Sequence, residues 1–299
     1  MILTPELRSE SLIEALPYIQ EFRGKTFVIK YGGAAMEDES IVDKFLRDIV
    51  FLEAVGINPV LVHGGGKAIT ARMRAAGLKS EFCNGLRVTD AAAMRIVEET
   101  LDGEINPSIV EVIKEFGGQA IGTSGKSVFV ARKLPPQSLE NGRVVDMGFV
   151  GEAVGVDISS VRAALLGQQV PVISPIGADA DGVVLNINAD VAAAALAAEL
   201  KATKLIFVSD VPGLMRDPTQ KESLFPSVNS AQVASLIKQK VIGGGMIPKV
   251  HSAVAALRNG VEKIHLIGGQ TPHSLLLEIF TNAGIGTEIC ETEHSHRPQ

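Results

Sequence analysis

The sequence predicts an α/β fold in which helices cover both faces of a mostly parallel sheet. Short runs of buried-strand residues alternate along the chain with longer helical patterns, as parallel sheets require. The 299 residues include no Trp and only 4% aromatic residues, so the core must be built from Val, Ile, Leu and Ala. Such aliphatic runs are typical of strands buried on both faces. A chain of this length forms one large domain or two closely joined lobes.

The first part of the chain begins with a helix and then repeats strand, glycine turn and helix. Residues 11–22 are expected to be helical, because Ser11 and Glu14 fit a capping box and apolar residues recur on one face. Pro17 is expected to kink this helix, which packs either on its own domain or on another subunit. The following elements are a strand at 27–29, a helix at 38–55, a strand at 59–62, a helix at 67–76 and an Asn-Gly hairpin at 81–89.

The alternation continues to the end of the chain, without an internal repeat or a low-complexity linker. The expected elements are helices at about 90–103 and 106–116, strands near 120–121 and 128–130, a hairpin at 142–156, strands at 170–174 and 183–188, an Ala-rich helix at 189–200, a strand at 205–210, a helix at about 248–259 and a strand at 264–267. The polar tail after Glu291 carries His294 and His296 without partners, so no metal role is expected there.

Composition and charge exclude several classes of protein. The net charge of −6 and the pI of about 5.6 argue against a nucleic-acid surface. Cys83 and Cys290 lie far apart, which fits neither a disulfide framework nor a metal site. The N-terminus lacks the pattern of a signal peptide, and the longest apolar run, 191–198, is too short to cross a bilayer. A cytoplasmic protein without a membrane role is expected.

Lysines and glycine turns indicate phosphate binding. A buried strand leads into Lys30 and the turn Gly32-Gly33, and the next strand ends in glycines 64–66 ahead of a helix. Glycines 243–245 similarly precede a helix that contains Lys249. Backbone N–H groups at such turns approach anions closely, and the helix dipole favours negative charge. A solvated lysine beside an ordinary tight turn is the alternative interpretation.

Polar residues at two further places suggest one substrate cleft. Arg87 precedes a helix and has the fork that grips a carboxylate, although a surface ion pair would also explain it. Asn186, Asn188 and Asp190 alternate along a strand edge, so their side chains would point to the same side. Capping of the following helix is the alternative for Asn188 and Asp190.

Other motifs fail on closer reading. Residues 120–127 approach the P-loop pattern, but Ala120 replaces its first glycine and a strand follows where a helix should. Neither triple glycine completes the dinucleotide motif, because Ile69 and Pro248 occupy the last position. The chain has no G-x-S-x-G elbow. No catalytic pattern unites His63, His251, His265 and His273.

Seven stretches in one order resemble the N-acetylglutamate kinase family of the amino acid kinase superfamily. They are residues 28–33, 62–66, 85–90, 148–152, 186–190, 209–213 and 243–249, and the resemblance covers about 9–290. Aspartate, glutamate 5-, uridylate and carbamate kinases share the superfamily pattern, whereas 85–90 and 186–190 select the acetylglutamate branch. Lys67 departs from the proline expected after the triple glycine.

The resemblance implies a three-layer αβα sandwich with an N-terminal extension helix at 1–24, an acyl amino acid lobe at 25–190 and a nucleotide lobe at 191–299. It implies N-acetyl-L-glutamate and ATP as substrates, with Mg²⁺ held by the ATP phosphates and no metal held by protein side chains. A related kinase for glutamate or aspartate and a non-catalytic amino-acid sensor remain the alternatives.

The resemblance also carries roles to individual positions. Catalysis goes to Lys30, Lys249 and Asp190, and substrate binding goes to Gly65, Gly66, Arg87, Asn186 and Asn188. ATP binding goes to Gly32, Gly33, Ser209, Asp210, Val211, Pro212, Gly213, Leu214, Gly243, Gly244 and Gly245.

The chain further resembles the arginine-sensitive members of that family. It has about 24 residues before the first core strand, as those members do, and its residues 278–287 also resemble theirs. L-Arginine is therefore expected as an inhibitor, contacting Glu278, Gly284 and Gly286. A homohexamer, a trimer of dimers interlaced by the N-terminal helices, is expected as well. A PII-type nitrogen regulator is a further partner that the resemblance leaves open.

Overall fold

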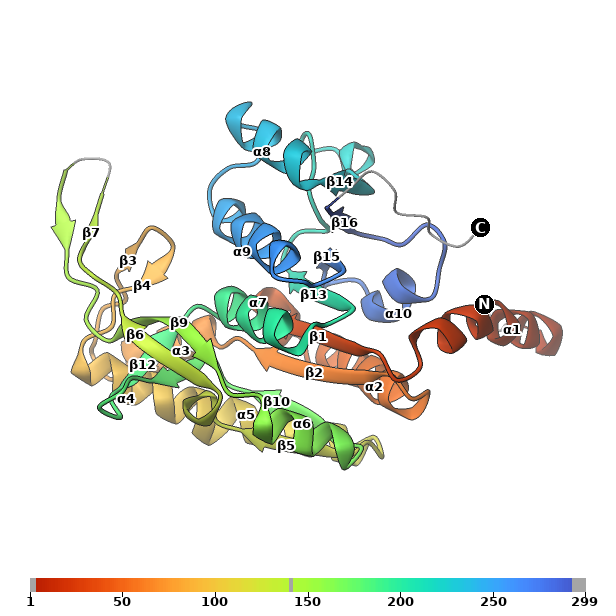
Figure 1. Cartoon of the computed structure of the whole chain (residues 1–299), viewed down its shortest axis with the longest axis horizontal. Coiled ribbons are helices and arrows are strands. Elements are labelled where there is room, and N and C mark those ends of the chain that lie inside the picture. The colour runs from red at the N-terminus through yellow and green to blue at the C-terminus, as the bar shows by residue number, and fades with distance from the viewer. Residues whose placement is uncertain (1–3, 140–141, 292–299) are drawn as a thin grey trace.

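The computed structural model describes residues 4–139 and 142–291. Within them, eight strands form one sheet in the order β14-β16-β15-β13-β1-β2-β10-β5 (Figure 1). Every neighbouring pair in this sheet is parallel except β15 and β16. The strands are β1 (Thr26–Tyr31), β2 (Asn58–His63), β5 (Ala120–Thr123), β10 (Val170–Ile173), β13 (Lys204–Ser209), β14 (Ser227–Asn229), β15 (Lys263–Gly268) and β16 (Thr287–Cys290).

Helices cover both faces of the sheet because its strands are apolar on both sides. Val28 of β1 joins a core cluster with the helices of one face, whereas its neighbours Phe27 and Ile29 join the cluster on the other face. The first face carries α6 (Ser159–Leu166), α7 (Ala189–Leu200), α8 (Ser230–Lys238) and α9 (Met246–Arg258). The second carries α1 (Pro5–Phe22), α2 (Glu39–Ala54), α5 (Asn106–Glu115) and α10 (Ser274–Ile279). The predicted αβα sandwich is confirmed.

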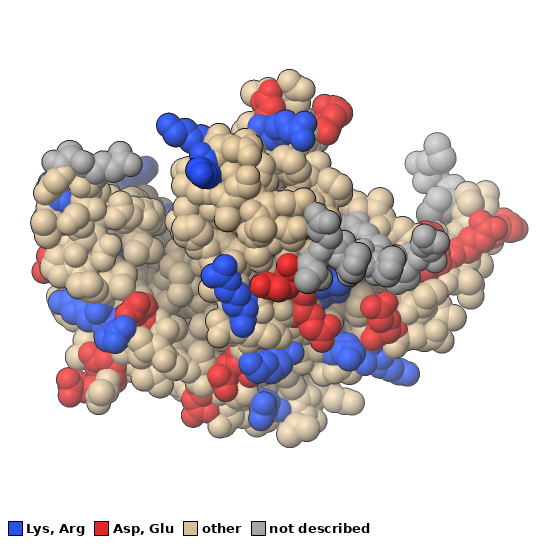
Figure 2. Space-filling model, turned by 45° about the horizontal axis from the view of Figure 1, so that its top comes forward, with Lys and Arg blue, Asp and Glu red and all other residues tan. Residues whose placement is uncertain are grey.

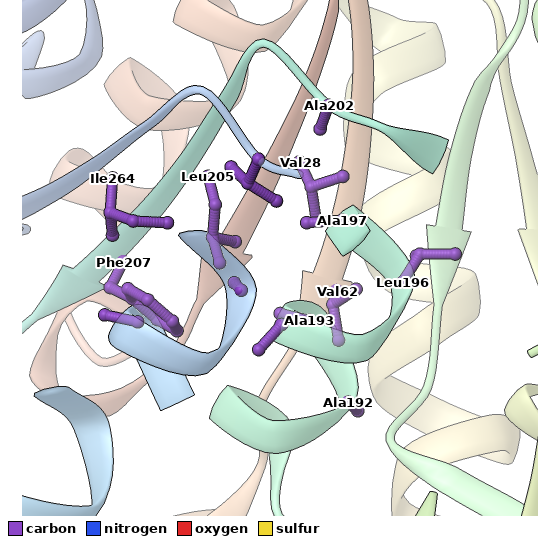
Figure 3. Packing of buried hydrophobic residues seen from close by; sticks show 14 of the residues in the cluster. Val28, Val62, Ala192, Ala193, Leu196, Ala197, Ala202, Leu205, Phe207 and Ile264 are labelled. Atoms are coloured by element: carbon purple, nitrogen blue, oxygen red, sulfur yellow. The ribbon is translucent and has the colours of Figure 1, made fainter. Parts of the chain in front are cut away.

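Alanines allow α7 to approach the sheet closely. Ala193 and Ala197 pack with Val28, Val62 and Leu205 of the strands in a fully buried cluster (Figure 3). The small side chains keep the first turn of α7 near the strand ends. That turn carries Asp190, one of the predicted catalytic residues.

Smaller β elements lie beside the main sheet. A closed barrel unites β6 (Phe129–Lys133), β9 (Val150–Val156), β11 (Ile176–Ala178) and β12 (Val184–Ile187). Two hairpins, β3–β4 (Phe82–Cys83 and Leu86–Arg87) and β7–β8 (Gln137–Ser138 and Val144–Val145), lie together at the left of Figure 1. The hairpin predicted at 81–89 is confirmed, with Asn84 and Gly85 at positive φ.

The hairpin predicted at 142–156 is wrong. β8 pairs with β7, and β9 pairs with β6 and β12 instead of folding back on β8. Alternating apolar residues in this stretch indicate strands correctly but do not identify their partners. Residues 120–127 run from β5 through a 3₁₀ turn, η3 (Gly125–Ser127), into β6, so the rejection of a P-loop is confirmed.

The N-terminal helix begins earlier than predicted. The side chain of Thr4 accepts a hydrogen bond from the Leu7 amide, and Pro5 occupies the first helical position, so α1 starts there and not at Ser11. The helix continues through Pro17. It extends from one end of the molecule in Figure 1.

The remaining helices agree with the prediction to within a few residues. α3 (Gly66–Ala75) and α4 (Ala91–Thr100) pack on each other beside the cleft described below. A π-helical turn, η2 (Leu101–Ile105), joins α4 directly to α5, which the sequence pattern did not indicate. α9 begins at Met246, two residues before the predicted start. Two further 3₁₀ turns are η1 (Gly33–Met36) and η4 (Lys221–Ser223).

Charged side chains of both signs are interspersed over the face shown in Figure 2. Among the described residues, no helix combines the length and the apolar character needed to cross a membrane. His294 and His296, at which no metal role is expected, lie outside the described residues.

Candidate active site

The central strands of the sheet end side by side at a cleft. β13, β1 and β2 are neighbours, and parallel strands place their carboxyl ends at one edge, where open α/β sheets bind ligands. The cleft has a volume of about 620 Å³. Among the residues that line it are the predicted Lys30, Gly33, Gly65, Gly66, Arg87, Asn186 and Asn188.

One carboxylate joins two lysines from opposite ends of the chain. The Lys30 ammonium lies 3.3 Å from Oδ1 of Asp190, and Nζ of Lys249 donates to Oδ2 at 2.8 Å. All three side chains are largely buried, and the ammonium of Lys249 also lies over the Phe207 ring. The structure thus brings together the three residues to which the resemblance assigned catalysis.

Burial and the neighbouring charges together shift the pKa values of Asp190 and Lys249. Burial opposes ionisation of Asp190, but the attraction of Lys30 and Lys249 outweighs it and lowers the pKa of the carboxyl below its usual range. Burial lowers the pKa of Lys249, against the attraction of Asp190. Asp190 is therefore ionised at neutral pH, with one lysine side chain at each of its two carboxylate oxygens.

Arg87 is buried by polar contacts and not by an ion pair. Its guanidinium donates to the Gly66 carbonyl at 2.8 Å, to Thr70 Oγ1 at 2.7 Å and to Ser80 Oγ at 2.6 Å, and it lies over the Phe82 ring. Burial lowers the pKa of Arg87. Within the described residues no carboxylate pairs with it, so the surface ion pair considered above is wrong.

The triple glycine is packed where its backbone turns from β2 into α3. The Gly64 amide donates to the Tyr31 carbonyl at 2.6 Å, which ties this turn to the end of β1. A Cβ at Gly65 would lie 2.6 Å from Leu101 and 2.8 Å from Ile105, whereas one at Gly66 would meet nothing within 4 Å. Glycine is therefore required at position 65 because a larger residue would clash with these side chains. Its backbone conformation does not require glycine, because a φ of 173° is available to any residue.

The two asparagines act differently. Asn188 caps α7, with its side chain accepting from the amides of Asp190 at 2.9 Å and Val191 at 3.2 Å. Asn186 donates to Thr89 Oγ1 at 3.2 Å. Both also line the cleft, so the capping interpretation of Asn188 holds together with its position at the site.

Of the predicted nucleotide residues, Gly33 lines the cleft, whereas the segments 209–214 and 243–245 are not part of its lining. Residues 210–214 follow β13, and the Leu214 amide donates to Thr287 Oγ1 at 2.9 Å, which anchors the loop. Gly33 has a φ of +75°, and its Cα faces the Asp210 side chain with no room for a Cβ. Glycines 243–245 are exposed at the start of α9, the helix that carries Lys249.

Several residues at the site were not identified from the sequence. Lys67 pairs with Glu37 at the mouth of the cleft, and Leu101 and Ile105 of the π-helical turn form part of its wall. Buried His63 donates from Nδ1 to the Gly64 carbonyl. Glu37, Leu101 and Ile105 are distant in the sequence or apolar, and no local motif marks them. His63 and Lys67 directly flank the triple glycine, so that motif could have indicated them.

Of the predicted effector residues, Glu278 lines a smaller pocket of about 70 Å³, whereas Gly284 and Gly286 are not part of its lining. Glu278 is 5% exposed and accepts hydrogen bonds from the amides of Ile285 at 2.7 Å and Gly286 at 2.9 Å, while its other oxygen contacts Nδ1 of His265 at 2.7 Å. Gly284 has a φ of +61°. The lining of this pocket combines residues of α1 with acidic and basic side chains of the sheet.

Comparison with known proteins decides the family. The Amino acid kinase family model matches residues 25–268. An acetylglutamate kinase of Akkermansia muciniphila is 50% identical over 279 residues, covering 93% of this chain and 94% of that protein. The chain belongs to the acetylglutamate kinases of the amino acid kinase family. An acetylglutamate kinase of Methanocaldococcus jannaschii is 47% identical over 287 residues, covering 94% and 96%.

Solved structures of the amino acid kinase fold superpose along most of the chain. An N-acetylglutamate synthase of Neisseria gonorrhoeae, in complex with coenzyme A and N-acetyl-glutamate, gives a TM-score of 0.83 at 28% identity over 96% of this chain. This chain spans only 64% of that synthase. A Giardia carbamate kinase gives a TM-score of 0.63 at 19% identity, covering 90% of this chain and 99% of that one, which shows the fold alone.

Proposed function

We propose that the protein transfers the γ-phosphoryl group of ATP to the γ-carboxylate of N-acetyl-L-glutamate, the second step of arginine biosynthesis. The products are ADP and N-acetyl-L-glutamyl 5-phosphate. The observation that carries the proposal is the contact of Lys30 and Lys249 with Asp190 at the edge of the cleft. Two ammonium groups held by one carboxylate form a site for a transferring phosphoryl group.

The reaction needs charge neutralisation more than acid–base catalysis. The acceptor carboxylate is already ionised at pH 7, so no general base is required. One of its oxygens forms a bond to the γ-phosphorus while the bond from phosphorus to the bridging oxygen of ADP breaks. Lys30 and Lys249 would offset the negative charge of both reactants, and Asp190 would keep the two ammonium groups in place.

The lining of the cleft suits an acyl amino acid. The amides of Gly65 and Gly66 would receive the γ-carboxylate, and the buried fork of Arg87 would receive the α-carboxylate. Asn186 and Asn188 also line the cleft, where their amide groups would bind the acetamido group. We therefore assign residues 25–190 to the acyl amino acid lobe.

Residues 191–299 form the proposed nucleotide lobe. The loop 209–214 and the glycines 32–33 and 243–245 would contact ATP, because Gly33 approaches Asp210 of that loop and glycines 243–245 precede the helix that carries Lys249. Among the described residues, no cluster of His, Cys, Asp or Glu could hold a metal ion. As the resemblance implies, Mg²⁺ would be held by the ATP phosphates, where it neutralises their charge.

A panel of acceptors tests the proposed reaction. With ATP and Mg²⁺, the purified protein should phosphorylate N-acetyl-L-glutamate and show little activity on L-glutamate or L-aspartate. Preference for an amino acid without the acetyl group would instead favour a related kinase. No ADP release with any acceptor would favour a non-catalytic sensor.

We further propose feedback inhibition by L-arginine at the pocket of about 70 Å³. Glu21 of α1 and Glu288 of β16 line it together with Glu278, which suits a guanidinium, and Lys204 and Lys263 suit the α-carboxylate. An N-acetylglutamate synthase of similar fold has been solved with L-arginine. Arginine bound between α1 and the sheet would inhibit if it prefers one arrangement of the lobes.

A homohexamer is proposed from the exposed surface of α1. Leu12 is 69% and Ile13 68% exposed, and Leu7 and Leu16 add to the same helix, whereas Tyr18 near its C-terminus is buried in the chain's own core. An apolar helix surface of this kind fits a second copy of the chain. We also propose, as a separate point, that the protein acts in the cytoplasm.

Deletion of residues 1–23 tests both regulatory proposals. The truncated protein should be a dimer that retains activity and loses most of its response to arginine, as measured by gel filtration and an arginine titration. A truncated protein that stays hexameric and fully inhibited would contradict them.

A further inference from the structure

We propose that His63, supported by Asn106, is a positioning residue that orients the Gly65 amide toward the acceptor carboxylate. The proposal rests on the function proposed above, because it concerns how the same cleft binds its acceptor. Neither residue lines the cleft, and the mechanism gives neither a direct role. Both are nevertheless buried polar residues directly behind the glycine turn.

The hydrogen bonds of His63 define its tautomer. Nδ1 lies 2.9 Å from the Gly64 carbonyl, which only accepts, so Nδ1 must carry the proton. Nε2 lies 3.2 Å from Nδ2 of Asn106, which only donates, so Nε2 must be unprotonated. Burial lowers the pKa of His63 to about 4, which keeps the ring neutral at physiological pH.

Asn106 is itself fixed in one orientation. Its Nδ2 also donates to the Val172 carbonyl of β10 at 2.9 Å, so the two hydrogens of the amide are used by Val172 and His63. Asn106 is the first residue of α5, directly after the π-helical turn 101–105. The wider turn places this side chain behind β2 while Leu101 packs on Gly65 from the cleft side.

The planarity of the peptide bond transmits this constraint to the site. The Gly64 carbonyl and the Gly65 N–H belong to one planar trans peptide and point in opposite directions. A donor that holds the carbonyl therefore also fixes the direction of the N–H. In the described part of the chain the Gly65 amide has no acceptor of its own, so it is available for an anion. Without His63, the glycine-rich turn would be free to rotate this peptide.

Two substitutions at His63 separate positioning from packing. In His63→Asn, the side-chain amide nitrogen occupies nearly the place of Nδ1 and can still donate to the Gly64 carbonyl. In His63→Gln, the side-chain amide reaches the place of Nε2, where its oxygen can accept from Asn106, and the Gly64 carbonyl is left without its donor. The readouts are kcat/KM for N-acetyl-L-glutamate, KM for ATP and the thermal unfolding midpoint.

We expect His63→Asn to keep kcat/KM for the acceptor within about 5-fold of the wild type, and His63→Gln to lower it by about 50-fold. KM for ATP should change little in either variant. Equal activities of two folded variants would overturn the proposal. A role in packing alone does not depend on where the side chain places its hydrogen-bond donor, so it gives no reason for His63→Asn to be the more active variant.

A spectroscopic measurement keeps the proposal testable if His63→Gln does not fold. Nitrogen-15 NMR of the wild-type protein, with His63 assigned from the His63→Asn spectrum, should show a neutral ring protonated at Nδ1 from pH 5.5 to 8. A ring protonated at Nε2 would overturn the proposal. A wild type inactive toward N-acetyl-L-glutamate would refute the proposed function, and the NMR result would still decide how His63 holds the Gly64 carbonyl.

Discussion

Nζ of Lys249 donates to Oδ2 of Asp190 at 2.8 Å, across 59 positions of sequence and between the first turns of α7 and α9. The same carboxylate holds Lys30 at the end of β1 through its other oxygen. The geometry of this cluster depends on two helices packing on one sheet face. It would allow the two proposed lobes to contribute to the single phosphoryl-transfer site proposed above.

Removal of either ammonium group should impair the chemical step more than ATP binding. Lys30→Ala and Lys249→Ala should each lower kcat by about 100-fold, equivalent to about 3 kcal/mol, with a much smaller change in the Kd for ATP. The exposed Lys114 of α5 provides a matched control, and Lys114→Ala should leave kcat unchanged. Near-normal turnover in either cluster variant would show that its lysine has no catalytic role.

Arg87→Lys should mainly raise KM for N-acetyl-L-glutamate, by about 10-fold or more. Lysine keeps the charge but loses the planar fork that here contacts Thr70 and Ser80 and would grip a carboxylate. Arg72→Lys is the matched control, because Arg72 lies in α3 and pairs with acidic side chains outside the cleft lining. An unchanged KM in Arg87→Lys would remove Arg87 from the substrate site.

Alanine substitutions in the triple glycine should separate two neighbouring positions. Gly65→Ala forces a Cβ against Leu101 and Ile105 and should reduce the free energy of unfolding by about 1–3 kcal/mol. Gly66→Ala has open space and should unfold at an unchanged urea concentration. Equal stability of the two variants in urea titrations would contradict the tight packing described for Gly65.

A buried carboxylate outside the cleft lining, that of Asp48, predicts a pH dependence of stability. Burial raises the pKa of Asp48 to about 6, opposed by its contact with His273 at 2.6 Å. The folded state then binds this proton more tightly than the unfolded state, whose Asp pKa is about 3.9. The free energy of unfolding should therefore fall, through this group, as pH rises from about 4 to about 6.

Urea titrations of the wild type and Asp48→Asn between pH 4 and 7 check this sign. The stability of the variant relative to the wild type should increase by on the order of 1 kcal/mol across that interval, because the variant has no proton to lose there. A constant difference between the two curves would show that Asp48 titrates normally in the folded protein.

The main sheet could be predicted because its signals are local, and the resemblance indicated the proposed catalytic cluster of Lys30, Lys249 and Asp190. Aliphatic runs identified the central strands, and lysines next to glycine turns pointed to one anion site. The partners of the strands could not be predicted, because strand pairing depends on tertiary structure. The incorrect hairpin at 142–156 is an example. The start of α1 was missed although Thr4-Pro5 is a recognisable beginning of a helix.

The supporting residues of the site could not be predicted from spacing. Asn106 reaches His63 only because a π-helical turn precedes α5, and no simple pattern announces such a turn. Glu278 was expected at a ligand, and the structure shows its carboxylate also holding the amides of Ile285 and Gly286. Local sequence does not show whether a buried charge is satisfied by its own chain.

The most direct test of the catalytic cluster is a single-turnover measurement on Asp190→Asn. Asparagine keeps the shape of the side chain but loses the charge that holds Lys30 and Lys249 together. With enzyme in excess over ATP and saturating N-acetyl-L-glutamate, rapid quenching should show phosphoryl transfer slowed by about 100-fold, with ATP still bound. A single-turnover rate within about 3-fold of the wild type would contradict the account.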